Sequence, residues 1–326
     1  MARLTMVKAL NLALAEALRE DPDVMILGED VGRDGGVFRV TDGLLNEFGE
    51  QRVVDTPLAE AAIVGAAIGL CFRGLRPICE IQFEGFSFPA FHHIEGHLRR
   101  FRNRTRGRYT CPLVIRMPYG GGIRALEHHS EAPEATYAHL AGLHVVLPSG
   151  PRNARALLRA AIFSPDPVIF FEPKALYRAF REEVPQEPET LPIGKGVVAR
   201  AGRDVTIISY GAMLRVALEA AEELFDTHQI DAEVLDLLSV APLDSALINA
   251  SVRKTGRAVV VHEAARHCGV GAEIVARIVE DSLLYLEAPV RRVTGFDTII
   301  PFFANEKNYL PDAARVVRAV VETVGF

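Results

Sequence analysis

The stretch DTPLAEAAIVGAAIGLCFRGLRPICEIQFEGF, residues 55–86, decides the fold. Residues 59–74 are mostly apolar over a helical length, and they lead almost directly into the short apolar run RPICEI at 76–81. A helix of this length that runs into a buried strand is typical of the connection between two parallel strands. The stretch therefore predicts an α/β fold built on a parallel sheet.

The same alternation of strands and helices extends outward in both directions. Runs that indicate strands are VMILGE at 24–29, PLVIRM at 112–117, PVIFFE at 167–172, DVTIISYG at 204–211, AEVLDLLS at 232–239, RAVVVHE at 257–263 and PVRRVTG at 289–295. Segments that indicate helices include PRNARALLRAAIF at 151–163, MLRVALEAAEELFDTH at 213–228 and GAEIVARIVEDSLLYL at 271–286. A Pro- and Glu-rich segment interrupts the alternation. We therefore expect two doubly wound α/β domains, residues 1–184 and 196–326, joined by a linker at 185–195.

Composition excludes several classes of protein. A net charge of -6 and a pI near 6.0 argue against a chain that binds nucleic acid or an anionic membrane. The basic run at 99–108 is the exception; a solvated helix end is favoured there over a docking surface for an acidic partner. The four cysteines have no metal-ligand spacing and are expected to be reduced and mostly buried. No apolar stretch approaches the roughly 20 residues that span a bilayer, and the first residues resemble a packed helix more than a signal peptide, so a cytoplasmic location is expected. A hydrophobic content of 49% suggests subunit interfaces.

Glycine-rich loops follow several predicted strands, at the end of a parallel sheet where ligands bind. GEDVGRDGG at 28–36 and PYGGG at 118–122 do not match a P-loop. GVGAEI at 269–274 matches GxGxxG only loosely and lacks the expected strand-to-helix context. These patterns give little support to a nicotinamide or ATP site, and tight turns that need positive φ are the favoured interpretation.

Glu60 is a carboxylate in the first turn of the apolar helix. One interpretation is a residue that complements the helix dipole, with Asp55 or Thr56 near the cap. The other is a buried acid that holds a proton more readily than an exposed one and serves proton chemistry. The sequence of the helix alone favours the first interpretation.

Aromatic and histidine residues follow two other strands. QFEGFSFPAF at 82–91 contains four phenylalanines, of which most are expected in the core, while one ring is available to stack on a flat heterocycle beside Gln82. His128 and His129 follow the glycine loop and offer general acid or base groups near neutral pH. Because adjacent side chains point in different directions, at most one of them is expected to face a given site.

Together these motifs resemble a known family. DTPLAE, EIQFEGF, the glycine loop followed by HHSEAPEA, DPVIFFEPKALYR and VTGFDTIIP are similar, in collinear order from about residue 4 to about 320, to the beta subunit of thiamine-diphosphate-dependent 2-oxo acid dehydrogenases. The likeness is greatest to the branched-chain member. It implies a transketolase-like pyrimidine-binding domain followed by a transketolase C-terminal-like domain, in an α2β2 heterotetramer with a separate alpha subunit.

The resemblance also implies roles for individual residues. Glu60 matches the acid whose carboxyl group hydrogen-bonds the N1' atom of the cofactor's aminopyrimidine and promotes loss of the C2 proton. Phe86 matches the ring that stacks on the pyrimidine, and Leu58 and Gln82 match neighbouring cofactor contacts. His129 matches the active-site histidine, although Glu131 stands where branched-chain relatives commonly have glutamine.

The resemblance further implies which partners complete the site. The sequence has no GDG motif, so the alpha subunit is expected to bind most of the Mg²⁺ and the diphosphate of a shared thiamine diphosphate. The expected reaction is oxidative decarboxylation of a branched-chain 2-oxo acid of the 3-methyl-2-oxobutanoate type, with acyl transfer to the lipoyl domain of a dihydrolipoyl acyltransferase core. The alternatives are a pyruvate dehydrogenase beta subunit, a non-catalytic scaffold subunit, and a self-sufficient enzyme of transketolase type, which the missing motif disfavours.

Overall fold

The computed structural model describes residues 2–326, and the chain forms two compact units. The first unit comprises Met1–Tyr119 and Thr136–Ile193, and the second comprises Gly120–Ala135 and Gly194–Phe326. These units differ from the expected boundaries 1–184, 185–195 and 196–326 in two places. Residues 120–135 belong to the second unit, and most of the expected linker belongs to the first.

The first unit is built on a parallel sheet. Its strands are β2 (Val24–Gly28), β3 (Val53–Asp55), β4 (Arg76–Glu80), β5 (Val114–Tyr119), β6 (His144–Val146) and β7 (Val168–Pro173). They follow the order β6-β7-β5-β4-β2-β3, and each neighbouring pair is parallel. Every residue of β2, β5 and β7 is buried, as expected for strands covered on both faces. The carboxyl ends of these strands therefore lie along one edge.

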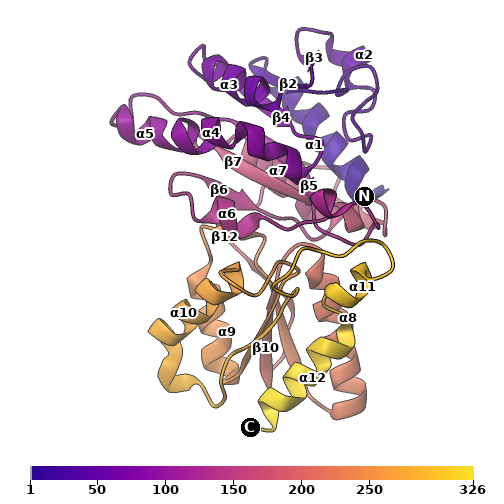
Figure 1. The fold of residues 1–326 in the computed structure, drawn as a ribbon, viewed down its shortest axis with the longest axis vertical. Helices are drawn as coiled ribbons and strands as arrows, with labels where there is room; N and C mark the ends of the chain where they lie inside the picture. Colours follow the sequence, from indigo (N-terminus) through magenta and orange to yellow (C-terminus); the bar gives the residue numbers. More distant parts are fainter. Residues whose placement is uncertain (1) are drawn as a thin grey trace. The chain divides into compact units, whose positions relative to one another are not determined.

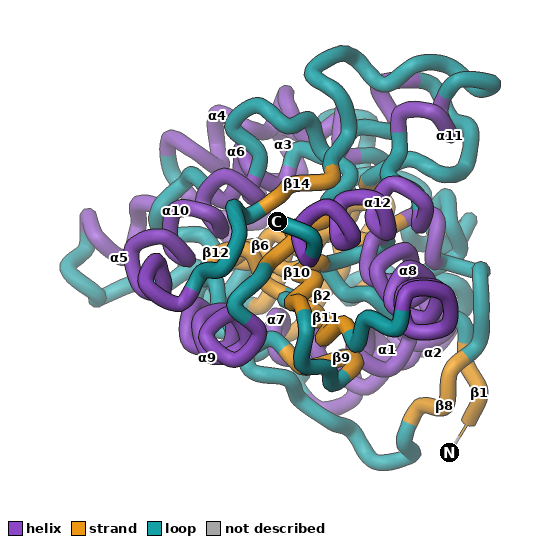
Figure 2. The backbone as a smooth tube through the Cα atoms, turned by 90° about the horizontal axis from the view of Figure 1, so that it is seen from below, coloured by secondary structure: helices purple, strands orange, loops and turns teal. Residues whose placement is uncertain are grey.

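Helices cover this sheet. They are α1 (Met6–Glu20), α2 (Leu44–Phe48), α3 (Glu60–Cys71), α4 (Phe88–Gly96), α5 (Phe101–Arg104) and α7 (Pro151–Ile162), with the short helices η1 (Glu84–Ser87), η2 (Leu98–Arg100) and η4 (Lys174–Leu176). α1 packs on α7, where the guanidinium of Arg155 binds the carboxylate of Glu16, and α3 packs on α4. The strands β1 (Ala2–Leu4) and β8 (Glu182–Val184) form a separate antiparallel pair (Figure 2).

The second unit has its own sheet. Its strands are β9 (Val197–Arg200), β10 (Val205–Ser209), β11 (Ala232–Asp236), β13 (Ala258–Val261) and β14 (Arg291–Val293), in the order β14-β13-β10-β11-β9. All pairs are parallel except β9 with β11. The helices α8 (Met213–His228) and α12 (Ala313–Val324) cover one face, and α9 (Ser245–Thr255) and α10 (Val270–Ser282) cover the other (Figures 1 and 2). The remaining elements are η3 (Glu127–His129), β12 (Ser239–Ala241), η5 (Leu283–Tyr285) and α11 (Glu306–Tyr309), and α6 (Glu134–Ala138) leads back to the first unit.

This architecture confirms the predicted α/β class with doubly wound sheets. Each strand predicted from the sequence begins within two residues of its expected start. None of the helices in residues 2–326 is long and apolar enough to cross a membrane. The basic run lies at a helix end, where Arg99 and Arg100 both bind Glu95, so these side chains are engaged within the chain.

Two local expectations need correction. The N-cap of α3 is Ala59, which has no side chain able to cap, whereas the carboxylate of Asp55 accepts hydrogen bonds from the backbone N–H groups of Gly32 and Arg33. The GVGAEI segment does have a strand-to-helix context, because it opens α10 after β13. The expectation of reduced, mostly buried cysteines is confirmed, because all four are free and only Cys268 among them is exposed.

Candidate functional site

Two acidic side chains lie where β2 meets α3. Glu60 is the first residue of α3 and only 9% of its surface is exposed. Glu29 directly follows β2 and is also buried. Burial raises the pKa of Glu29, the negative charges of Glu60 and Asp30 raise it further, and a hydrogen bond from the Ala59 backbone acts in the opposite direction. The effect of the Glu60 charge on the pKa of Glu29 indicates that the two carboxyl groups lie within electrostatic reach of each other.

Gln82 and Phe86 extend this edge from the end of β4. The side-chain amide of Gln82 donates a hydrogen bond to Oδ2 of Asp30 at 3.1 Å, which joins the segment after β4 to the loop after β2. Phe86 lies in η1, half-buried, with its ring 5.9 Å from that of Phe83 in an edge-on arrangement. The neighbouring strands β2 and β4 thus bring Glu29, Gln82 and Phe86 to the same edge of the first unit.

Buried polar contacts fix the position of η1. Nζ of Lys174 lies 3.1 Å from Oε2 of Glu84, and neither side chain is more than 1% exposed. The hydroxyl of Tyr137 donates to Oγ of Ser87 at 2.5 Å. Burial raises the pKa of Tyr137 to about 12, so the hydroxyl stays protonated at neutral pH. The ring of Phe86 is therefore presented from a rigid support.

Leu58 differs from these residues because 79% of its surface is exposed. It immediately precedes α3 and the buried Glu60. The contact expected of Leu58 therefore requires a group from outside this unit.

Beneath the strand ends lies a buried ionic network. Arg116 donates to Glu80 at 2.7 Å and to both carboxylate oxygens of Glu172 at 2.7 and 3.1 Å, and the hydroxyl of Tyr177 donates to Glu172 at 2.6 Å. Burial acts to lower the pKa of Arg116, but Glu172 and Glu80 outweigh it and raise this pKa. The guanidinium thus stays charged and connects β4, β5 and β7 directly below the candidate site.

His129 belongs to the second unit, not to the unit that contains the other predicted residues. It ends η3, and its ring centroid lies 6.0 Å from that of His128. The backbone N–H of Gly120 donates to the carbonyl of Glu131 at 2.8 Å, which closes the loop that carries both histidines. His129 and Glu131 are therefore part of one closed loop in the second unit.

The second unit also contains a buried acid, Glu134, that the sequence analysis did not identify as a site residue. Glu134 has no exposed surface, and burial raises its pKa to about 8, while a hydrogen bond from the hydroxyl of Tyr210 at 2.7 Å acts in the opposite direction. It lies three residues beyond Glu131. Glu29 lies in the GEDVGRDGG segment and Glu134 in HHSEAPEA, but neither motif indicates that its acid is buried. The place of Glu29 directly after a buried strand is a usable signal.

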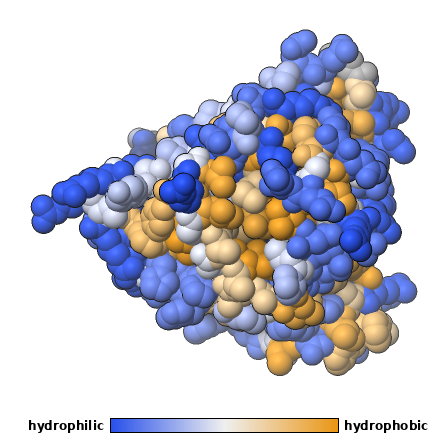
Figure 3. All heavy atoms as spheres, turned by 90° about the horizontal axis from the view of Figure 1, so that it is seen from above, coloured by the Kyte–Doolittle hydropathy of each residue, from blue (hydrophilic) through white to orange (hydrophobic). Residues whose placement is uncertain are grey.

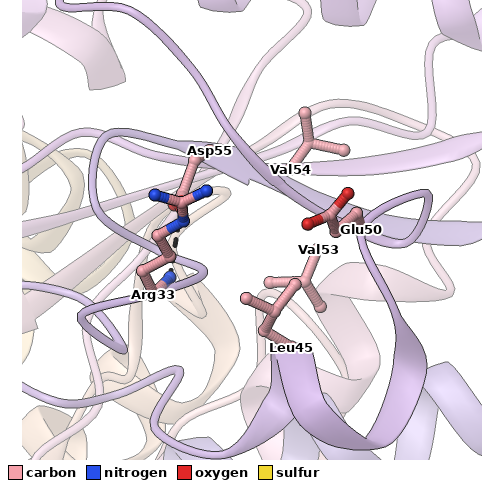
Figure 4. Close-up of a pocket in the computed structure, with 6 residues that line it drawn as sticks. All are labelled: Arg33, Leu45, Glu50, Val53, Val54 and Asp55. Atoms are coloured by element: carbon pink, nitrogen blue, oxygen red, sulfur yellow. Dashed lines mark hydrogen bonds between the residues drawn. The ribbon is translucent and has the colours of Figure 1, made fainter.

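Two pockets open on the first unit. One, of about 410 Å³ and shown in Figure 4, is lined by Arg33, Leu45, Glu50, Val53, Val54 and Asp55. The other, of about 550 Å³, lies between α3 and α4 and is lined by Ala61, Ala62, Gly65, Ala66, Ile68, His93, His97 and Phe101. Neither pocket includes a predicted site residue, so neither identifies the site by its shape.

The side chains at this edge suit a flat, nitrogen-containing heterocycle. Glu29 has a buried oxygen, Oε1, with no hydrogen-bond partner within residues 2–326, and Glu60 lies within electrostatic reach. These carboxyl groups offer acceptors or a shared proton, and Phe86 offers a ring face. The His, Cys, Asp and Glu side chains of the described residues form no cluster that could hold a metal ion. The edge thus fits the pyrimidine end of thiamine diphosphate better than its metal-bound diphosphate end.

Comparison with known proteins identifies two family domains in this chain. Residues 2–179 match the family described as the transketolase pyrimidine binding domain, and residues 194–316 match the transketolase C-terminal domain. The chain is 51% identical over 326 residues to the pyruvate dehydrogenase E1 component subunit beta of Staphylococcus aureus, covering 100% of both chains. It is 46% identical to the protein of the same name from Acholeplasma laidlawii, covering 97% of this chain and 96% of the relative. A solved structure described as a split gene transketolase, inactive beta4 tetramer, is 25% identical with a TM-score of 0.82 and covers 99% of both chains.

Proposed function

The chain belongs to the beta-subunit family of 2-oxo acid dehydrogenase E1 components, and on that premise we propose that it is the beta subunit of a pyruvate dehydrogenase. Its fold is the transketolase-like one that the sequence predicted. The substrate proposal rests on relatives named for pyruvate that are similar along the whole chain. The branched-chain expectation rested on short local likenesses, so full-length similarity favours the pyruvate alternative.

The proposed active site is divided between two polypeptides. The family implies thiamine diphosphate, which supplies a nucleophilic carbon and an electron sink for decarboxylation. Leu58, Glu60, Gln82 and Phe86 would hold its pyrimidine end. The alpha subunit would bind Mg²⁺ and the diphosphate, because this chain offers neither a GDG motif nor a cluster of metal ligands in the part that the structure describes.

The single observation that carries the catalytic part of this proposal is the pair of buried acids where β2 meets α3. Burial and the negative charge of Glu60 raise the pKa of Glu29, so Glu29 retains a proton more readily than an isolated exposed carboxyl group. Glu60 would exchange a proton with the N1' atom of the pyrimidine, and Glu29 would tune how readily it does so. Phe86 would orient the heterocycle against this acid, and His129 would assist proton transfer or lipoyl acylation from the second unit.

Exposed apolar side chains support the proposed partners. Figure 3 shows hydrophobic residues gathered on the face in view among hydrophilic ones. Large apolar side chains of the first unit that are at least 40% exposed include Leu58, Phe72, Phe88 and Tyr109. Such surface is costly to leave in water and is typical of subunit contacts. We assign it to contacts within an α2β2 heterotetramer, and we assign acyl transfer to the lipoyl domain of a dihydrolipoyl acyltransferase core.

Substrate choice is tested with the chain reconstituted with its alpha subunit. We expect kcat/KM for pyruvate to exceed that for 3-methyl-2-oxobutanoate by at least roughly tenfold, because two additional methyl groups must fit the same pocket. Steady-state decarboxylation with an artificial electron acceptor measures both values. A tenfold preference for 3-methyl-2-oxobutanoate would overturn the pyruvate proposal and restore the branched-chain assignment.

A further inference from the structure

Buried carboxylates from distant parts of the second unit bind the backbone of the glycine loop. Oε2 of Glu263 accepts a hydrogen bond from the N–H of Gly121 at 2.9 Å. The two oxygens of Glu306 accept from the N–H of Gly122 at 2.9 Å and from that of Arg124 at 3.0 Å. The acceptors lie 142 to 184 residues beyond the donors in sequence, so only the folded second unit brings them together.

Burial of these carboxylates constrains the loop. Glu263 is 5% exposed and Glu306 is 4% exposed. A carboxylate removed from water is strongly destabilising unless hydrogen bonds replace its hydration. The three loop N–H groups provide such bonds, and bonds to charged groups are stronger than those between neutral groups. These hydrogen bonds therefore favour the one position of the loop backbone in which both buried carboxylates are bonded.

The glycines are needed because the carboxylates approach so closely. A Cβ at Gly120, where φ is +81°, would lie 2.6 Å from Oε1 of Glu263. A Cβ at Gly121 would lie 3.1 Å from atoms of Ile300 and Leu310 and 3.2 Å from Oε1 of Glu306. Gly120 and Gly121 thus fit a close contact with the two acids, beyond the turn conformation that the sequence suggested.

The backbone of this loop is held while part of its surface stays exposed. The Gly120–Glu131 hydrogen bond closes the loop. Burial, together with the charges of Glu263, Glu131 and Glu134, raises the pKa of Tyr309 in α11 to about 12, so these carboxyl groups lie within electrostatic reach of its hydroxyl. Residues 122–124 and 128 are exposed, and His129 is half-buried. The backbone of residues 121–124 is therefore anchored, although residues 122–124 remain accessible at the surface.

We propose that Glu263 and Glu306 are positioning residues that clamp the backbone of residues 121–124 in the 120–131 loop and thereby fix His129 for its reaction. The inference rests on the role given to His129 in the proposed function. Glu306 is the better residue to test, because both of its oxygens bind the loop. In Glu306→Gln one of the two oxygens becomes an amide N–H₂ group, which cannot accept a hydrogen bond from the backbone.

The test compares Glu306→Gln with a matched control in the reconstituted complex with the alpha subunit. The control is Glu273→Gln on α10, whose carboxylate binds Arg277 at the surface and is 56% exposed. Hydrogen exchange of the 120–131 amides is measured together with acylation of a lipoyl domain. We expect Glu306→Gln to speed exchange at the loop roughly tenfold and to slow acylation, while Glu273→Gln behaves as wild type. Exchange and acylation in Glu306→Gln equal to the control would refute the clamp.

Further measurements distinguish failure of the clamp from general damage and from failure of the role proposed for His129. Exchange of the cofactor's C2 proton depends on Glu60 in the first unit, and we expect Glu306→Gln to retain it. A loss of C2 exchange together with acylation would indicate general damage and overturn a positioning role. Gly121→Ala places a Cβ 3.2 Å from Oε1 of Glu306, and it should reproduce the effects if Glu306→Gln folds poorly. Wild-type acylation by His129→Ala would instead refute the role of the histidine in the proposed function.

Discussion

At the scale of single residues, both units contain buried carboxyl groups with perturbed pKa values. Glu29 and Glu134 both have pKa values raised by burial, one in each unit, and Glu60 lies beside the first of them. The sequence drew attention to Glu60 as a carboxylate in an apolar helix, and the family resemblance gave it a catalytic role. It did not indicate Glu29 or Glu134, since their burial and neighbours arise only after the sheets have formed.

Glu134 provides a pH-dependent test of this environment. Its pKa is about 8 in the folded chain against 4.5 for the free group, so unfolding releases a proton between these values. Its contribution to stability is therefore fully present below about pH 4.5 and is lost as pH rises toward 8, with a slope of up to ~1.4 kcal/mol per pH unit. Glu134→Gln has no titrating group at this position. Its free energy of unfolding should therefore rise relative to that of wild type as pH increases from about 4.5 to about 8.

Chemical denaturation of the isolated full-length chain at several pH values measures this difference. Glu273→Gln, which removes an exposed carboxylate from the same unit, should follow the wild-type pH dependence. If the free energy of unfolding had the same pH dependence in wild type and in Glu134→Gln, the raised pKa of Glu134 would be contradicted.

At the scale of elements, periodicity located the long helices and the buried strands well. α8 coincides with its predicted range of 213–228, because its apolar face repeats with the helical period. The short strands β3, β6 and β9 were not predicted, whereas β13 and β14, which are as short, were. The antiparallel pairing of β9 with β11 was also not predictable, because it depends on which sheet edge remains free.

The Arg116 network tests how strongly the strand ends are fixed. Arg116→Met leaves Glu80 and Glu172 buried without their cation, so we expect a loss of roughly 3–5 kcal/mol in the free energy of unfolding. Arg102→Met removes a partly exposed ion pair with Asp166 and should cost less than about 1 kcal/mol. Urea denaturation measures both, and equal losses in the two variants would contradict a structural role for the buried network.

At the scale of the whole molecule, the sequence predicted two doubly wound units and an incomplete cofactor site. It did not predict that residues 120–135 join the second unit, because the contacts responsible come from Glu263 and Glu306, far along the chain. The substrate was also poorly predicted from the sequence motifs. A few local motifs favoured a branched-chain acid, whereas similarity over the full length favours pyruvate.

Exchange of the C2 proton of thiamine diphosphate tests most directly whether Glu60 drives chemistry at a site shared by two chains. We expect rapid exchange when the wild-type chain is combined with its alpha subunit, thiamine diphosphate and Mg²⁺. Exchange should fall to the rate of the free cofactor when Glu60→Gln replaces wild type, or when the alpha subunit is omitted. Rapid exchange in Glu60→Gln, or in the chain without its partner, would contradict the divided site and the role of this acid.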